Sequence, residues 1–250
     1  MIEWWSYRPS DFLMFAPRTY WRLFELHNQA WWPAPWLLLL AGLPWLLWLP
    51  RHSTLALRAG AVGLALAWAF VGWFFLHERY SPVNWVMSWG AYVFLVQALG
   101  LAVLGIRNDL KPTPSRAARS AGLLLCGWAL LGQPLLALAF GRPWRQAEVY
   151  GLAPDPTVIA TLGLLVLVAA GAGATRWLQR ALWVLALAWC AVSAATLWTM
   201  GSAQGWVPCV TGSAMPMLRA RPTVIKPSWR CKLPAPWRAF SSPPGTTTLA

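Results

Sequence analysis

Four consecutive residues whose side chains could take part in chemistry lie between two long apolar runs: His77, Glu78, Arg79 and Tyr80. Imidazole changes charge near neutral pH, and a carboxylate beside membrane spans often serves an ion or proton path. The opposite charges of Glu78 and Arg79 can also form a structural ion pair, with each other or with the N-terminal region. The stretch therefore predicts either a proton or cation site or a structural clamp, and a catalytic carboxylate is the third alternative.

Asp155 begins another apolar run, directly before Pro156. A side-chain acceptor followed by proline is typical of a helix start, because the acceptor binds free N–H groups and the proline has none to lose. We expect a helix cap at this position, with a ligand role as the alternative. The candidate polar cluster then comprises His77, Glu78, Arg79, Tyr80 and Asp155.

Two glutamines, Gln97 and Gln133, lie deep inside apolar runs, the second of them directly before Pro134. Proline frees a backbone carbonyl that a neighbouring group or water must satisfy. Glutamine in a membrane helix either lines a polar pathway or donates hydrogen bonds to a neighbouring helix. Both interpretations stay open, and Gln97 and Gln133 are our candidate pathway residues.

Signatures of enzymes and metal centres are missing from the sequence. The chain has no HExxH, GxSxG, P-loop or glycine-rich dinucleotide motif, and its four cysteines lack zinc or redox spacing. His27, Glu25 and Glu148 fall on the same expected side of the membrane as the polar cluster, but their spacing defines no metal site. We therefore predict no catalytic residue, no metal and no cofactor.

The composition indicates which elements must position these residues. The chain is 58% hydrophobic and only 11% charged, and it contains 21 tryptophans, a side chain favoured where hydrocarbon meets headgroups. Its net charge of +13 arises from Lys and Arg that lie between and after the apolar runs, which is the pattern of a membrane topology and not of nucleic-acid binding. The predicted partner is the lipid bilayer.

The apolar runs predict an all-α, polytopic membrane helix bundle of about six transmembrane helices, each about the length that crosses a bilayer core. An amphipathic interfacial helix region over 1–30 precedes the membrane domain, 31–200, because apolar and polar residues occupy opposite faces of its helical pattern. Residues 201–250 hold eight prolines and six basic residues, and we expect a basic, disordered tail. The expected spans lie near 31–50, 59–76, 85–106, 120–141, 156–175 and 181–200.

The distribution of Lys and Arg gives an orientation. The loops around 51–58, 107–119 and 176–180 share one side and carry eight of these residues, whereas the other side carries six without the tail. This bias places the first side in the cytoplasm and the N-terminus outside. The basic tail argues the other way, which leaves a translocated tail, a further membrane segment near 205–218 or an inverted orientation as alternatives.

Several motifs are distinctive: residues 3–13 and 17–25, Glu78-Arg79-Tyr80 with Asn84-Trp85, and 153–157 with Thr161-Leu162-Gly163. Together they resemble a family of bacterial multi-pass membrane proteins that is catalogued as a domain of unknown function and sometimes labelled a permease. The resemblance covers roughly 3–200, and it implies a bacterial inner-membrane location without implying an activity. The tail departs from what the resemblance implies, since relatives are expected to stay apolar beyond Pro208.

These observations favour a transporter-like membrane protein that moves or senses a small solute or ion, with Glu78, His77 and Asp155 at its outer mouth. The alternative is a structural or accessory membrane subunit in which the same residues only hold segments together. An enzyme acting on lipid at the membrane surface is the third hypothesis. The sequence defines neither the solute nor the oligomeric state.

Overall fold

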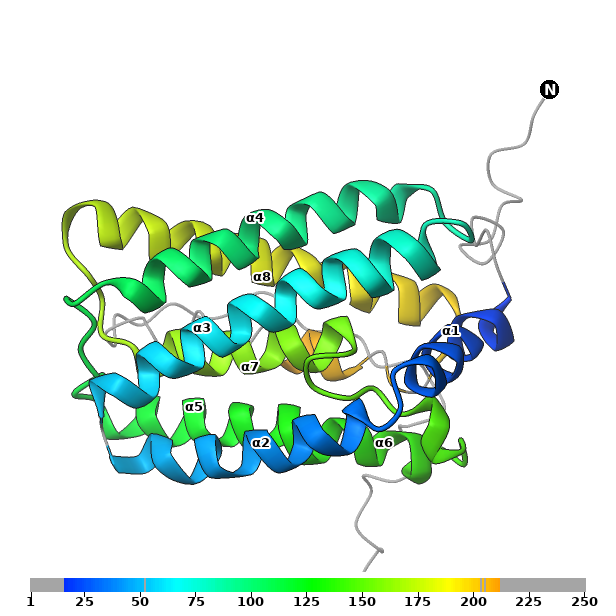
Figure 1. The fold of residues 1–250 in the computed structure, drawn as a ribbon, viewed down its shortest axis with the longest axis horizontal. Helices are drawn as coiled ribbons and strands as arrows, with labels where there is room; N and C mark the ends of the chain where they lie inside the picture. The colour runs from blue at the N-terminus through cyan, green and yellow to red at the C-terminus, as the bar shows by residue number, and fades with distance from the viewer. Residues whose placement is uncertain (1–15, 52, 203, 205, 212–250) are drawn as a thin grey trace, which may run out of the picture. The chain divides into compact units, whose positions relative to one another are not determined.

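The structure is a computed structural model that describes residues 16–51, 53–202, 204 and 206–211. These residues form a bundle of helices (Figure 1), which confirms the all-α prediction. The α-helices are α1 (Pro17–Ala30), α2 (Ala34–Trp48), α3 (Thr54–Phe70), α4 (Val86–Ile106), α5 (Arg116–Gly127), α6 (Gln133–Ala139), α7 (Pro154–Leu167) and α8 (Gly173–Thr199). Short helical segments adjoin them: the 3-10 turns η3 (Leu49–Arg51) and η6 (Trp144–Gln146), and the π-helices η4 (Val71–Tyr80) and η5 (Trp128–Gly132).

Within the described part of the chain, five continuous helical segments are long and apolar enough to cross a membrane. They are Ala34–Arg51, Thr54–Tyr80, Val86–Ile106, Arg116–Ala139 and Gly173–Thr199, and each overlaps one of the expected spans. Their apolar side chains face outward in large number, as suits a protein whose solvent is lipid. These features define a membrane protein.

The remaining expected span, 156–175, is the shorter helix α7, and every one of its residues is buried. It lies inside the bundle against α3, α5 and α8 (Figure 1). Gly122 of α5 and Gly163 of α7 bring two backbones together, because a Cβ at Gly122 would lie 2.8 Å from the Gly163 carbonyl oxygen. On another side of α7, Trp68 Nε1 donates a hydrogen bond to Thr161 Oγ1 at 2.7 Å.

The chain leaves α7 in an extended conformation, and hydrogen bonds from elsewhere satisfy its backbone. Thr113 N–H donates to the Leu167 carbonyl at 2.7 Å, and Ala169 N–H donates to the Lys111 carbonyl at 2.8 Å. Gln179 Nε2 donates to the Ala169 carbonyl at 3.1 Å. Extended backbone is stable at membrane depth only when protein supplies its partners, and these residues supply them.

The expected span 59–76 extends further in the structure, because α3 continues as the π-helix η4 to Tyr80. This continuation carries Phe75 into the core, where its ring lies 4.8 Å from that of Phe24 in α1. The polar stretch is therefore the last helical turns of a long helix, and the turn to α4 follows at 81–85.

The helices place the loops at two opposite ends of the bundle. At the basic end, Arg58 Nε donates to the Gly105 carbonyl at 3.0 Å, and Thr175 Oγ1 donates to Asp109 Oδ2 at 2.7 Å, so the starts of α3 and α8 meet the end of α4. At the polar end lie α1, the end of η4, the segment 141–153 and the start of α7.

The chain beyond α8 also packs at the polar end as far as it is described. Residues 206–211 are helical, Val207 is buried, and Gln204 Nε2 donates to the Leu136 carbonyl at 3.4 Å. The disordered tail expected from residue 201 thus begins with a packed segment, and 212–250 lie outside the described residues.

Candidate functional site

The segment 141–153 forms the lining of the candidate site, and its conformation is fixed at both ends. Gly141 and Gly151 adopt φ values of +69° and +79°, in the left-handed region that favours glycine. Asn28 of α1 donates through Nδ2 to the Arg145 carbonyl at 2.9 Å and to the Ala147 carbonyl at 2.8 Å. Because these contacts hold the backbone of 145–147 against α1, the side chain that follows is directed into the protein.

That side chain is Glu148, which is only 2% exposed. Its Oε2 accepts a hydrogen bond from Gln133 Nε2 at 3.4 Å, and its Oε1 has no hydrogen-bond partner among the described residues. Gln133 Oε1 also lacks one there. A buried carboxylate with one long hydrogen bond costs free energy in its charged form, so this position strongly disfavours ionisation.

Asp155 is the second buried carboxylate, at 4% exposed, and its hydrogen bonds are satisfied. Its Oδ1 accepts from Trp189 Nε1 at 2.9 Å, and its Oδ2 accepts from Ser193 Oγ at 2.5 Å. The expected helix cap is wrong, because α7 begins after Ala153 with no side-chain cap. Asp155 lies in the first turn with its oxygens directed to α8, so it joins two helices.

Electrostatic repulsion links the two carboxylates. Burial raises the pKa of Glu148 well above its usual range, the nearby charge of Asp155 raises it further, and Arg142 and the Gln133 hydrogen bond lower it. Tyr20 of α1 lies in the same electrostatic environment, since burial, Asp155 and Glu148 all raise the pKa of its phenol. The site thus combines two acids with one basic group.

Arg142 stands at the edge of this site. Its guanidinium lies 3.5 Å from the centroid of the Trp21 ring, a cation–π contact with α1, and its Nη1 donates to the Gln146 carbonyl at 3.4 Å. Its buried Nη2 has no hydrogen-bond partner among the described residues. Arg142 is therefore held near Glu148 without an ion pair to it among the described residues, and it has further N–H groups to donate.

The buried face of α1 contributes aromatic packing to the polar end. His27 contacts the rings of Phe75 and Phe70, with centroid distances of 5.2 and 5.9 Å. Burial, assisted by the charge of Arg79, lowers the pKa of His27 to about 3. Its imidazole is therefore neutral, and neither ring nitrogen has a hydrogen-bond partner among the described residues.

The structure separates the members of the predicted polar cluster. Tyr80 is buried and senses the charge of Asp155, so these two lie in the same region. Glu78 is exposed, and His77 is partly exposed with its ring 4.9 Å from that of Trp73. Arg79 is partly exposed and contributes charge near His27. The ion pair considered for Glu78 is not among the described contacts, and Arg22 instead pairs with Glu25 at 2.6 Å.

The two candidate pathway glutamines lie in different places. Gln133 contacts Glu148, as described above. Gln97 of α4 is fully buried, and its Nε2 donates to the Leu182 carbonyl of α8 at 3.1 Å, so it joins two membrane helices. Its Oε1 has no partner among the described residues.

The sequence drew attention to Glu78 because it stands among other polar residues, whereas the buried acid is Glu148. The sequence pattern that could have indicated this burial is that Glu148 lies between two apolar residues, Ala147 and Val149. An isolated acid in an apolar segment is a candidate for burial, and a run of polar residues is usually solvated. No group of three or more His, Cys, Asp or Glu suited to a metal occurs in the described part of the chain.

Membrane-length helices that enclose a buried acidic pair define an all-helical, multi-pass membrane protein. The chain belongs to a family of unknown function, DUF6064, which matches residues 18–219. The predicted resemblance to an uncharacterised family is thereby confirmed, and the match continues beyond residue 200 into the expected tail. Searches among curated proteins and among solved structures found no match.

Proposed function

We propose that the chain is a transporter-like membrane protein that binds and releases a proton at Glu148 while it moves or senses a small solute or ion. The observation that carries the proposal is the burial of Glu148 beside the second buried carboxylate, Asp155, with one Glu148 oxygen unpartnered among the described residues. Two carboxylates in one site of low dielectric resist simultaneous ionisation, so the pair retains a proton. A change of conformation can then release it.

The surroundings of Glu148 provide the means of release. Burial and Asp155 favour its protonated form, whereas Arg142 favours its ionised form. A small displacement of the segment 141–153 toward Arg142 or toward water would therefore discharge the proton. A hollow of about 590 Å³ lies beside this segment, lined in part by Asn28, Trp144 and Val149, and it offers a route for water or solute.

The proposal includes a bacterial inner-membrane location with the N-terminus outside and the polar end on the outer face. The family resemblance supports the location, and the excess of Lys and Arg in the loops 51–58, 107–119 and 176–180 supports the orientation. A permease-like activity is part of the same proposal.

A structural or accessory role is the second candidate, and a specific observation favours it. Asp155 satisfies both of its oxygens with Trp189 and Ser193, and Asn28 satisfies two backbone carbonyls, so much of the polar end holds segments together. Under this alternative Glu148 would stay protonated throughout the working cycle and contribute only to stability.

The direct test follows the proton on Glu148. We expect infrared difference spectra of the purified protein between about pH 6 and about pH 10 to show the loss of a protonated carboxyl band. Glu148→Gln should remove that band, whereas Glu78→Gln, which changes an exposed acid at the same end, should leave it unchanged. Identical spectra for the wild type and Glu148→Gln would contradict the proposal.

Vesicles containing the protein then separate transport from a structural role. A transporter of this kind should accelerate dissipation of an imposed pH gradient relative to protein-free vesicles, and Glu148→Gln should abolish the acceleration. If the wild type gives no acceleration and the variant loses only thermal stability, the structural alternative is correct.

A further inference from the structure

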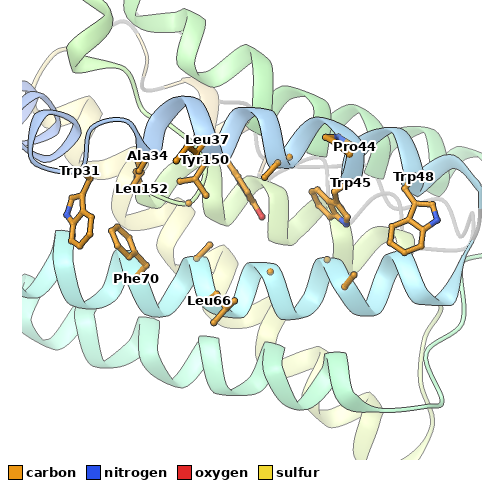
Figure 2. Close-up of a pocket in the computed structure, with 18 of the residues that line it drawn as sticks. Trp31, Ala34, Leu37, Pro44, Trp45, Trp48, Leu66, Phe70, Tyr150 and Leu152 are labelled. Carbon is orange, nitrogen blue, oxygen red and sulfur yellow. The ribbon is translucent and has the colours of Figure 1, made fainter.

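A long apolar groove runs between α2 and α3, with a volume of about 930 Å³. Figure 2 shows Trp31 and Phe70 at one end of it and Trp45 and Trp48 toward the other, with side chains of both helices facing one another across the gap. Its floor includes Tyr150, Gly151 and Leu152, which follow Glu148 in the chain. The groove thus lies along the side of the bundle and reaches the candidate site.

Most of the side chains that line the groove are apolar. The indole N–H of Trp45 is already donated to the Ala56 carbonyl at 3.2 Å. Small residues widen the α3 wall, where Ala59 and Gly63 are exposed and a Cβ at Gly63 would meet nothing within 4 Å. An occupant must therefore be apolar along most of its length.

Both walls are helices of membrane length, so the groove opens at the depth of the hydrocarbon core. A void at this depth forfeits the dispersion contacts of its lining, and acyl chains are the molecules present to fill it.

One end of the groove carries a positive charge. Arg51, in the turn after α2, lines the groove and is exposed, with no hydrogen bond or ion pair to any described residue. Trp48 lies in the same region, and tryptophan is favoured at the level of lipid headgroups. A basic side chain beside an apolar channel complements an acyl chain that ends in an anionic headgroup.

We propose that this groove is a binding site for a phospholipid of the surrounding bilayer, with one acyl chain lying between α2 and α3 and an anionic headgroup at Arg51. The occupant packs against Tyr150 and Leu152, so its presence stabilises the conformation of the segment that carries Glu148. The site does not depend on the proposed proton chemistry, because its evidence is the groove and the charge at its end.

Photoactivatable lipids test the proposal on the full chain in bilayer nanodiscs. A phosphatidylglycerol with a diazirine on its acyl chain should label peptides of α2 and α3 in preference to the rest of the chain. Gly63→Leu places a side chain in the groove where space is open, and it should lower this labelling at least about fivefold. Arg51→Gln should remove a preference for phosphatidylglycerol over phosphatidylcholine of about fivefold, the contribution of one basic residue at an anionic surface.

Ala188→Leu is the matched control, because it adds the same side chain to an exposed position on α8 outside the groove, and it should leave labelling unchanged. If Gly63→Leu fails to fold, Ala59→Leu fills the same wall. Labelling spread evenly over the outer helices, or unaffected by Gly63→Leu, would overturn the site. A crosslink between two copies through α2 and α3 would also overturn it, and equal labelling by both lipids would overturn the headgroup assignment. None of these readouts requires proton movement.

Discussion

Two buried carboxylates at the polar end differ in how they are satisfied, and this difference assigns their roles. Asp155 receives a hydrogen bond on each oxygen from α8, whereas Glu148 receives one long bond from Gln133. A satisfied carboxylate contributes to structure because moving it would leave Trp189 and Ser193 without an acceptor. A poorly satisfied one can change protonation at smaller structural cost. We therefore expect Glu148 to be the carboxyl group whose protonation changes with pH.

The first prediction concerns the pH dependence of stability. Burial raises the pKa of Glu148 to about 8, so the folded protein holds this proton more tightly than the unfolded chain does. The stabilisation from this proton is complete below the pKa that Glu148 has in the unfolded chain. It is lost as the pH rises toward the pKa that Glu148 has in the folded protein. The slope approaches about 1.4 kcal/mol per pH unit, the value for one proton. Thermal unfolding in detergent from pH 5 to pH 9 should therefore show falling stability.

Glu148→Gln is the variant that checks the origin of this slope. Glutamine keeps the shape of the side chain and cannot ionise, so its unfolding temperature should vary less with pH than that of the wild type. Glu78→Gln removes an exposed acid at the same end and should retain the wild-type slope. If the Glu148→Gln slope equals that of the wild type, another group controls the pH dependence.

The second prediction concerns the link between α7 and α8. Asp155→Ala should destabilise the protein by about 1–3 kcal/mol for each donor left without an acceptor, here Trp189 Nε1 and the Ser193 hydroxyl. Asp155→Asn keeps one acceptor oxygen and should lose less. Unfolding temperatures of the two variants measured at one pH give the comparison, and equal losses would show that hydrogen bonding is not the reason.

At the residue level the sequence located Asp155, because an acid before proline at the start of an apolar run is a local pattern. Its partners were not predictable, since Trp189 and Ser193 are 34 and 38 positions away. Glu148 was named only as one of several acids on the polar side, because its burial depends on Asn28 holding the segment from a distant helix.

α5 and α7 pack closely where they cross. A Cβ at Gly163 would lie 2.7 Å from Cys126 Sγ and 2.9 Å from the Gly122 carbonyl oxygen. A carbonyl oxygen belongs to the backbone and cannot move aside as a side chain does. The short distance between the helices therefore depends on glycine in both of them.

The third prediction follows from this crossing. Gly163→Ala should destabilise the protein by about 1–3 kcal/mol, the typical cost of overpacking. Gly127→Ala is the control on α5, because its Cβ would meet only a Leu46 methyl group at 4.0 Å. That substitution should be neutral or slightly stabilising, since alanine favours a helix more than glycine does. Unfolding temperatures and yields in detergent test the pair, and equal losses would show that the close crossing is not the cause.

At the element level the spans were predictable because hydropathy is a local property of the chain. Five of the expected spans overlap membrane-length helices, but α7 ends at Leu167 and not near 175. The sequence after Leu167 stays apolar, so a prediction from hydropathy alone extends the span to about residue 175. Its true end depends on Lys111, Thr113 and Gln179, which bind the extended backbone from other segments.

On the scale of the whole molecule, charge and burial divide between the two ends of the bundle. The basic loops meet at one end through Arg58 and Asp109, and the buried acids lie at the other. α7 runs between the two ends and is surrounded by other helices, since all of its residues are buried. A crossing that lipid does not touch can be shorter and can carry polar residues such as Thr157 and Thr161.

The last prediction concerns which end faces the cytoplasm. The eight Lys and Arg of the loops 51–58, 107–119 and 176–180 predict that the basic end lies inside the cell. In a cysteine-free background of intact bacterial cells, Arg145→Cys at the polar end should react with a membrane-impermeant maleimide, because Arg145 is exposed. Lys111→Cys, exposed at the basic end, should react only after the cells are permeabilised. The reverse pattern would invert the orientation and place Glu148 on the cytoplasmic side, where the proton would then be taken up from the cell interior.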